Sequence, residues 1–169
     1  ALAAPPIGGF FILIGFLFVL PFAIPFNMNY GTGTLDGLAY LRDTHSGDAG
    51  GIAFLRTLKG DERIVEAEGG DYTYYSRISS FTGIPTIIGM PFHEFMWRGD
   101  DTGWFNARLA DVQSIYENPE TTTQLMRKYN ATLLYIGDAE RERYNVNIST
   151  KNLEKIYSAD ATEIFRLTA

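Results

Sequence analysis

An uncharged apolar run near the N-terminus constrains the fold of this chain more than any other feature. Residues 7–26 read IGGFFILIGFLFVLPFAIPF, and no Asp, Glu, Lys, Arg or His precedes Asp36. An α-helix needs about 20 apolar residues to cross the hydrocarbon core of a bilayer. A signal peptide would carry a basic residue before a shorter apolar run. The sequence therefore predicts a transmembrane helix within residues 1–30, with a buried core helix as the competing interpretation.

The remainder of the chain is charged and acidic. All 14 Lys and Arg residues and all 20 Asp and Glu residues lie after the apolar run, and the net charge is -6. This charge argues against a nucleic-acid partner, because phosphate binding needs a basic face. The chain has no cysteine, so disulfides and thiolate metal sites are excluded. We predict a linker over residues 31–51, rich in Gly, Thr, Asn and Asp, and an extracytoplasmic α/β domain over residues 52–169.

Within this domain, short apolar strands alternate with helical stretches. We expect strands at residues 63–67, 85–89 and 132–136, and helices at residues 52–58, 92–97, 110–116 and 122–129. The last strands, at 155–158 and 163–167, flank a turn typical of a hairpin. The predicted fold is an α/β domain: one N-terminal transmembrane helix, then a small mostly parallel sheet with flanking helices and a C-terminal hairpin.

The segment GGDYTYYSRISSFTG, residues 69–83, is the densest polar and aromatic stretch of the chain. It follows the first predicted strand directly, and ligands of open α/β sheets bind at the carboxyl ends of strands. Aromatic stacking and charged hydrogen bonds suit a sugar or a phosphate. The candidate binding residues here are Asp71, Tyr72, Tyr74, Tyr75 and Arg77. The alternative is a packed loop whose tyrosines fill the seam between the domain and the membrane.

A second polar cluster, PFHEFMWRGDDTGW, occupies residues 91–104. It adds His93, Glu94 and Arg98 to the candidate substrate-binding residues. The adjacent carboxylates of Asp100 and Asp101 suit a divalent cation such as Ca²⁺ or Mg²⁺, although the regular spacing of an EF-hand loop is missing. The alternative is a capped turn in which Arg98 pairs with these carboxylates.

Common catalytic motifs are missing from the sequence. There is no GxSxG, P-loop or GxGxxG pattern, and we assign no catalytic residue. Asn130 and Asn147 each begin an N-glycosylation sequon, which fits a domain that faces outside the cell membrane. The run AERERY, residues 139–144, is expected to form a solvated charged turn.

Four segments carry a resemblance to a known family. They are LDGLAYLRDTH at residues 35–45, GGDYTYYSRISSFTGIPTIIG at 69–89, PFHEFMWRG at 91–99 and YNATLLYIGDAERERY at 129–144. In these the chain resembles the large YYY membrane proteins of archaea and Chloroflexi, which are similar to lipid-linked sugar transferases of the GT-C type. Asp71 and Tyr72 also resemble part of the WWDYG segment of oligosaccharyltransferases, with glycines at 69 and 70 in place of the two tryptophans.

The resemblance implies the C-terminal soluble lobe of a polytopic membrane protein. Such a lobe would contribute to substrate binding, would be inactive alone, and would have the bilayer and the remaining transmembrane part as its partners. The alternative hypothesis is a processed structural subunit that assembles through its apolar helix into a filament or membrane complex. Type IV pilin-like subunits also begin with an apolar helix, but they carry an early acid that this chain does not have.

Overall fold

The structure, a computed structural model, describes residues 36–99 and 102–168. The chain separates into two units, residues 1–39 and residues 40–169. In the described part of the first unit, the Asp36 carboxylate accepts a hydrogen bond from the Leu38 N–H at 3.0 Å. The predicted transmembrane helix lies outside the described residues. Among the residues that are described, no helix has both the length and the hydropathy of a membrane span.

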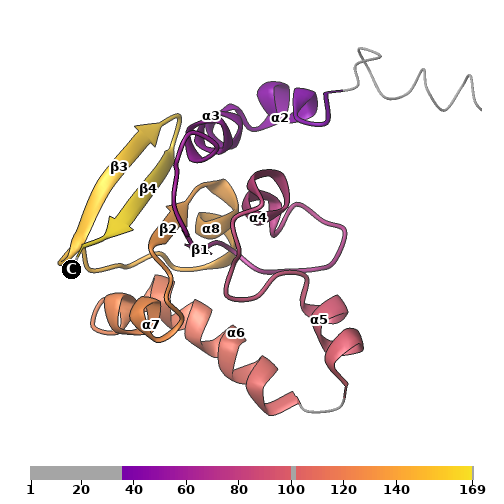
Figure 1. Cartoon of the computed structure of the whole chain (residues 1–169), viewed down its shortest axis with the longest axis vertical. Helices are drawn as coiled ribbons and strands as arrows, with labels where there is room; N and C mark the ends of the chain where they lie inside the picture. Colours follow the sequence, from indigo (N-terminus) through magenta and orange to yellow (C-terminus); the bar gives the residue numbers. More distant parts are fainter. Residues whose placement is uncertain (1–35, 100–101, 169) are drawn as a thin grey trace, which may run out of the picture. The chain divides into compact units, whose positions relative to one another are not determined.

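The second unit is a mixed α/β domain around one sheet. Its strands are β1 (Ile64–Val65), β2 (Leu133–Ile136), β3 (Leu153–Ala159) and β4 (Thr162–Leu167), in the order β1-β2-β4-β3. The predicted C-terminal hairpin is confirmed as β3 and β4, the yellow arrows of Figure 1. The prediction of a mostly parallel sheet is wrong. The hairpin joins the sheet through β4, which pairs antiparallel with β2, so β1 and β2 are the parallel neighbours among the described strands.

The apolar run at residues 85–89, predicted as a strand, does not form a ladder strand. Thr86 makes one isolated bridge to Ile64, and the Ile64 N–H donates to the Pro85 carbonyl at 2.9 Å. Pro85 has no N–H to give to a ladder. Ile87 and Ile88 are nevertheless buried, so the run contributes side chains to the core without extending the sheet.

In the view of Figure 1, helices lie above, below and to the right of the sheet, and the hairpin lies at its left side. They are α2 (Ala39–Thr44), α3 (Ser46–Leu55), α4 (Arg77–Thr82), α5 (Pro91–Arg98), α6 (Thr102–Glu117), α7 (Thr122–Lys128) and α8 (Asp138–Arg143). Helices α2 and α3 thus occupy much of the predicted linker. Buried Leu41, Asp48 and Ile52 explain this, because each helix has an inward face to cover. The charged turn predicted at residues 139–144 is instead helix α8, since Ala139 and Glu140 point inward.

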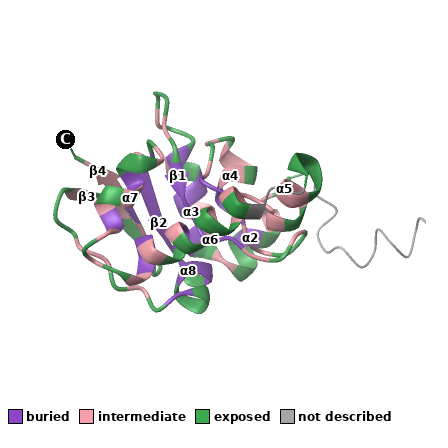
Figure 2. Ribbon diagram, turned by 90° about the horizontal axis from the view of Figure 1, so that it is seen from below, coloured by how far each residue is buried: buried purple, intermediate pink, exposed green. Residues whose placement is uncertain are grey.

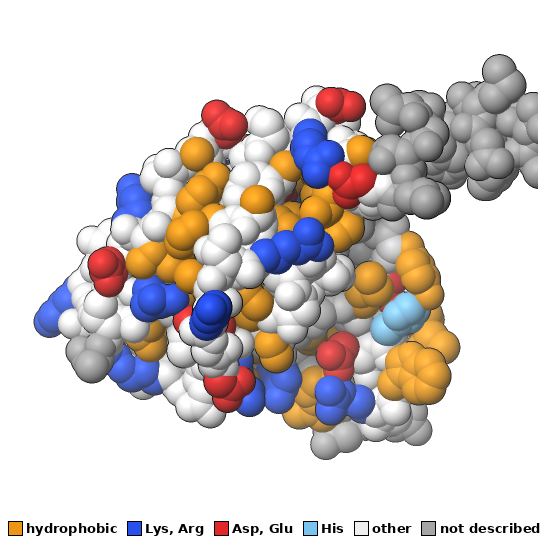
Figure 3. All heavy atoms as spheres, turned by 45° about the horizontal axis from the view of Figure 1, so that its top comes forward, with side chains coloured by type: hydrophobic (Ala, Val, Ile, Leu, Met, Phe, Trp, Pro, Cys, Tyr) orange, Lys and Arg blue, Asp and Glu red, His pale blue; other side chains and the backbone are white. Residues whose placement is uncertain are grey.

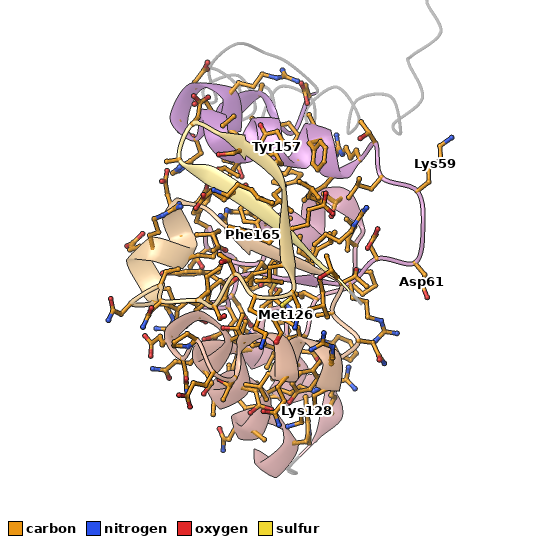
Figure 4. The ribbon with its side chains drawn as sticks, turned by 90° about the vertical axis from the view of Figure 1, so that its left-hand side faces the viewer. Lys59, Asp61, Met126, Lys128, Tyr157 and Phe165 are labelled. Carbon is orange, nitrogen blue, oxygen red and sulfur yellow. The ribbon has the colours of Figure 1, made fainter. Side chains whose placement is uncertain are left out.

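The core lies between β2 and helices α6 and α7. All four residues of β2 are buried, as the purple strand in Figure 2 shows. Met126 of α7 and Phe165 of β4 belong to the same core cluster, and Figure 4 labels Phe165 on the hairpin with Met126 below it. The buried Tyr116 hydroxyl of α6 donates to the carbonyls of Val65 and Tyr135, at 3.1 and 2.8 Å. This hydroxyl therefore links α6 to both parallel strands.

Candidate functional site

The loop after β1 is fastened to helix α5 by Asp71. Its carboxylate accepts the Phe92 N–H at 3.2 Å and the His93 N–H at 2.9 Å. Helix α5 starts with Pro91, and its first-turn N–H groups have no partner inside the helix. Asp71 supplies that partner and a favourable negative charge at the helix N-terminus. The role that the structure gives Asp71 is therefore to position α5.

Tyr72 and His93 form a contact between the same two segments. The Tyr72 hydroxyl and His93 Nε2 are 2.7 Å apart, and their rings meet edge to face at 4.8 Å. Tyr72 has a φ of 58°, an uncommon backbone conformation for a side chain of its size. Its side chain is 81% exposed. The loop thus holds a tyrosine outward and uses its hydroxyl to orient the imidazole.

A shallow hollow of about 410 Å³ lies on the outer surface of α5. The predicted binding residues His93, Glu94 and Arg98 all line it, together with Met90 and Trp97. Arg98 Nε donates to Glu94 Oε2 at 2.5 Å, one helical turn away, and the Arg98 guanidinium lies 5.1 Å from the ring centre of Trp104. Figure 3 shows hydrophobic side chains gathered beside a histidine at the edge where α5 lies. The hollow therefore combines an acceptor, a cation, an imidazole and an exposed indole.

Arg77 and Tyr74, also predicted to bind substrate, point into the protein instead. Arg77 is 3% exposed and donates to two buried carboxylates, those of Asp48 and Glu140. Its Nη1 and Nη2 reach Glu140 at 3.1 and 2.9 Å, and Nη2 reaches Asp48 Oδ1 at 3.2 Å. The Tyr74 hydroxyl donates to Asp48. We call Asp48, Arg77 and Glu140 the buried triad; it joins α3, α4 and α8.

Asp48 and Arg77 form a charged pair inside the protein. Burial works to raise the pKa of the Asp48 carboxyl, but hydrogen bonds and the charge of Arg77 outweigh it and hold that pKa below its usual value. Burial likewise works to lower the pKa of Arg77, and the neighbouring Glu140 and Asp48 raise it. The pKa of the Tyr135 hydroxyl is raised by burial and by Asp48, to which it donates at 2.6 Å. Asp48 therefore stays ionised through the neutral range, while Arg77 and Tyr135 keep their protons, so these side chains brace the fold and exchange no proton there.

Glu66 is a further buried acid, directly after β1. Its two oxygens accept the N–H groups of Ile78 and Ser79, at 2.8 and 2.9 Å, in the first turn of α4. Burial raises the pKa of Glu66 to about 7, although the bonds from Ser79 and the charge of Arg77 act in the opposite direction. The pKa of Glu66 therefore lies close to neutral pH.

Tyr75 fills the space beside Gly69. A Cβ atom on Gly69 would lie 2.1 Å from Cδ2 of the Tyr75 ring, closer than real atoms approach. Tyr75 itself packs against the hydrophobic core. This packing gives a physical reason for a glycine at position 69, because a tryptophan there would displace the Tyr75 ring.

The remaining predicted sites are located as follows. Asp100 and Asp101 lie outside the described residues, and among residues that are described no group of three or more His, Asp or Glu could hold a metal ion. Asn130 and Asn147 are both exposed. Asn130 follows α7 with a φ of 53°, and the Asn147 N–H donates to the Tyr116 carbonyl at 2.7 Å. Both side chains therefore face solvent, as a sequon requires.

A larger hollow of about 570 Å³ lies between the segment after α8 and the hairpin. Its cations, Arg141 and Lys155, share the carboxylate of Glu163. None of the predicted substrate-binding residues lines it; Asn147, a predicted glycosylation site, does. We therefore place the candidate site on α5.

Sequence reasoning missed Trp97 and the buried carboxylates of Asp48, Glu66 and Glu140. Trp97 stands within the cluster at 91–104, and its position one turn after His93 was a usable signal. Glu140 follows a buried strand by four residues, in a run that looked fully solvated. Asp48 stood in a glycine-rich stretch that gave no sign of burial.

No protein-family model, curated protein or solved structure matches this chain.

Proposed function

We propose that this chain is the soluble lobe of a polytopic membrane protein resembling the GT-C type sugar transferases, and that the hollow on α5 binds the sugar of a lipid-linked substrate. The observation that carries this proposal is the convergence of His93, Glu94 and Arg98 with the exposed Trp97. The three polar residues come from a cluster that the sequence alone indicated. The reaction itself would take place on the rest of the protein.

The chemistry of the hollow suits a sugar. A pyranose has an apolar C–H face that stacks on an indole and hydroxyls that exchange hydrogen bonds with charged side chains. Glu94 and Arg98 lie one helical turn apart and supply a hydrogen-bond acceptor and a hydrogen-bond donor. The Tyr72 hydroxyl fixes the His93 ring beside them. An indole has two side-chain torsions to fix, so it offers a large contact area at a low cost in side-chain entropy.

The apolar run at residues 7–26 supports the membrane part of the proposal. It has the length and hydropathy of a transmembrane helix, and the described domain follows after a short polar stretch. The domain would face outside the cell, where the sequons at Asn130 and Asn147 are accessible for glycosylation.

The proposal is tested by titrating the full chain, in mild detergent, with dolichyl phosphomannose. Trp104→Phe leaves Trp97 as the sole tryptophan, so its emission reports on the hollow. We expect a saturable change with dolichyl phosphomannose and a smaller one with dolichyl phosphate. Arg98→Ala should weaken the response. The control is Lys59→Ala, which removes an exposed charge on another loop and should leave the response unchanged (Figure 4). Equal responses to the two lipids would refute sugar recognition.

The alternative function, a structural subunit that assembles through its apolar helix, draws support from one observation. Helix α5 leaves Phe92, Met96 and Trp97 exposed, and such a surface also suits assembly. Sedimentation in mild detergent separates the two functions. Large particles built from the 18.9 kDa chain alone would favour assembly, and a complex several times heavier that contains other spans would favour the transferase.

A further inference from the structure

Large hydrophobic side chains are exposed on and beside α5. Among the described residues, the exposed large hydrophobics are Tyr40, Tyr72, Phe92, Met96 and Trp97, and all but Tyr40 belong to α5 or to the loop fastened to it. Trp97 is 85% exposed and Tyr72 81%. Single exposed hydrophobics are ordinary, but a cluster of this kind marks a surface that something covers.

The cluster is ordered around the helix. At about 100° per residue, Phe92 and Met96 form one stripe, His93 and Trp97 the next, and Glu94 and Arg98 the third. Phe95, on the remaining side, meets Phe105 of α6 edge to face at 6.3 Å. The free surface of α5 therefore has three adjacent stripes: an apolar stripe, a stripe of aromatic side chains that carry polar groups, and a stripe formed by an ion pair.

We infer that α5 lies in the headgroup region of the bilayer, with Phe92 and Met96 toward the acyl chains and the Glu94–Arg98 pair toward water. This order matches the polarity gradient across a membrane interface, where Trp and Tyr occupy the headgroup level. The inference rests on the proposed anchoring by residues 7–26. From residue 26 to Asp36 an extended chain spans about 35 Å at most, so the anchor would keep the domain within reach of the surface.

The inference also explains the position of the hollow. A lipid-linked sugar presents its phosphate and sugar just above the acyl chains. With α5 at that depth, the stripe of His93 and Trp97 would meet the sugar without removing the carrier from the membrane. The bilayer would then cover the apolar stripe and leave the polar side of the hollow open.

Depth-dependent fluorescence quenching tests the inference on the full chain in phosphatidylcholine vesicles. Three variants each carry a single tryptophan. Trp104→Phe keeps the native Trp97. The other two combine Trp97→Phe and Trp104→Phe with either Phe92→Trp or Lys59→Trp. The native side chains at positions 59, 92 and 97 are all exposed, so substitutions there disturb little packing. One set of vesicles carries a nitroxide near the headgroup, and a second set carries it at the end of the acyl chain.

The expected result is a gradient. The nitroxide near the headgroup should quench the tryptophans at 92 and 97 and leave the one at 59 unquenched, because an interfacial helix inserts its apolar stripe about 5–10 Å. The nitroxide at the end of the acyl chain should quench the tryptophan at 92 more than the one at 97, because residue 92 lies deeper. Absence of quenching at 92, or equal quenching at 59, would overturn the inference. Emission at 92 that changes only with protein density would assign the surface to a second copy, and would also overturn it. The vesicles contain no sugar lipid, so failure of sugar binding leaves this test unaffected.

Discussion

Replacing Arg77 by methionine should destabilise the domain severely, because it leaves two carboxylates buried without their cation. Arg77 makes four hydrogen bonds to Asp48 and Glu140, and both acids are at most 3% exposed. Each acid keeps other donors: Asp48 keeps two tyrosine hydroxyls, and Glu140 keeps the N–H groups of Ala67 and Gly137 at 2.8 Å each. Breaking one side of a buried ion pair costs about 3–5 kcal/mol.

This loss is a large fraction of the stability of a domain of ordinary size, roughly 5–15 kcal/mol. For the described unit it corresponds to a fall in Tm of about 10–20 °C. The assay is thermal and urea unfolding of the full chain in mild detergent, followed by far-UV circular dichroism. The control is Arg141→Met, which removes a more exposed ion pair with Glu163 and a hydrogen bond to the Ala161 carbonyl and should cost about 1–2 kcal/mol.

A compensating variant separates charge from packing. Removing all three charges, with Arg77→Met, Asp48→Asn and Glu140→Gln together, should recover part of the loss, because no uncompensated charge stays buried. If Arg77→Met costs no more than Arg141→Met, or if the triple variant is as unstable as Arg77→Met, the reasoning about the buried triad is refuted.

Further expectations concern three other residues. Folded Glu66 has a pKa of about 7, above the 4.5 of an ordinary glutamate, so the folded state binds the proton more tightly. The free energy of unfolding should therefore fall, by up to about 3 kcal/mol, as the pH rises between those values, and urea titrations of Glu66→Gln should show this slope removed. Gly69→Ala should lower stability by about 1–3 kcal/mol through the clash with Tyr75, and Tyr75→Ala should relieve that clash in a double-mutant cycle. Asp71→Ala should remove the cap of α5 at a cost of about 1 kcal/mol, seen as faster hydrogen exchange of the Phe92 and His93 amides while those of β2 are unchanged.

The sequence predicted those parts of the fold that depend on local pattern. The hairpin β3–β4, the apolar strand β2 and helices α5 and α7 lie close to their expected positions, because short-range periodicity and turn residues specify them. The antiparallel pairing was not predicted because it depends on β4 of the hairpin pairing with β2, a contact between residues far apart in the sequence. Proline cannot donate to a ladder, which fits the single isolated bridge that Thr86 makes next to Pro85.

In the candidate site too, the contacts between residues close in the sequence were predictable and the long-range contacts were not. Three predicted polar residues of α5 meet in one hollow because helical spacing alone brings them together. Arg77 could not be placed from the sequence, since its partners lie 29 and 63 residues away in segments without an apolar pattern. The Tyr72–His93 contact, across 21 residues, depends on the loop conformation that Asp71 and the positive φ of Tyr72 establish.

Methyl NMR tests the location of the sugar site most directly, since suitable reporters are already in the chain. Met90 lines the hollow on α5, Met126 lies in the core, and Ile148 lines the larger hollow beside the hairpin. The full chain, labelled at methionine and isoleucine methyls, is titrated with dolichyl phosphomannose in detergent. The Met90 resonance should shift with saturation, while those of Met126 and Ile148 stay in place. A shift of Ile148 without one of Met90 would contradict a sugar site on α5.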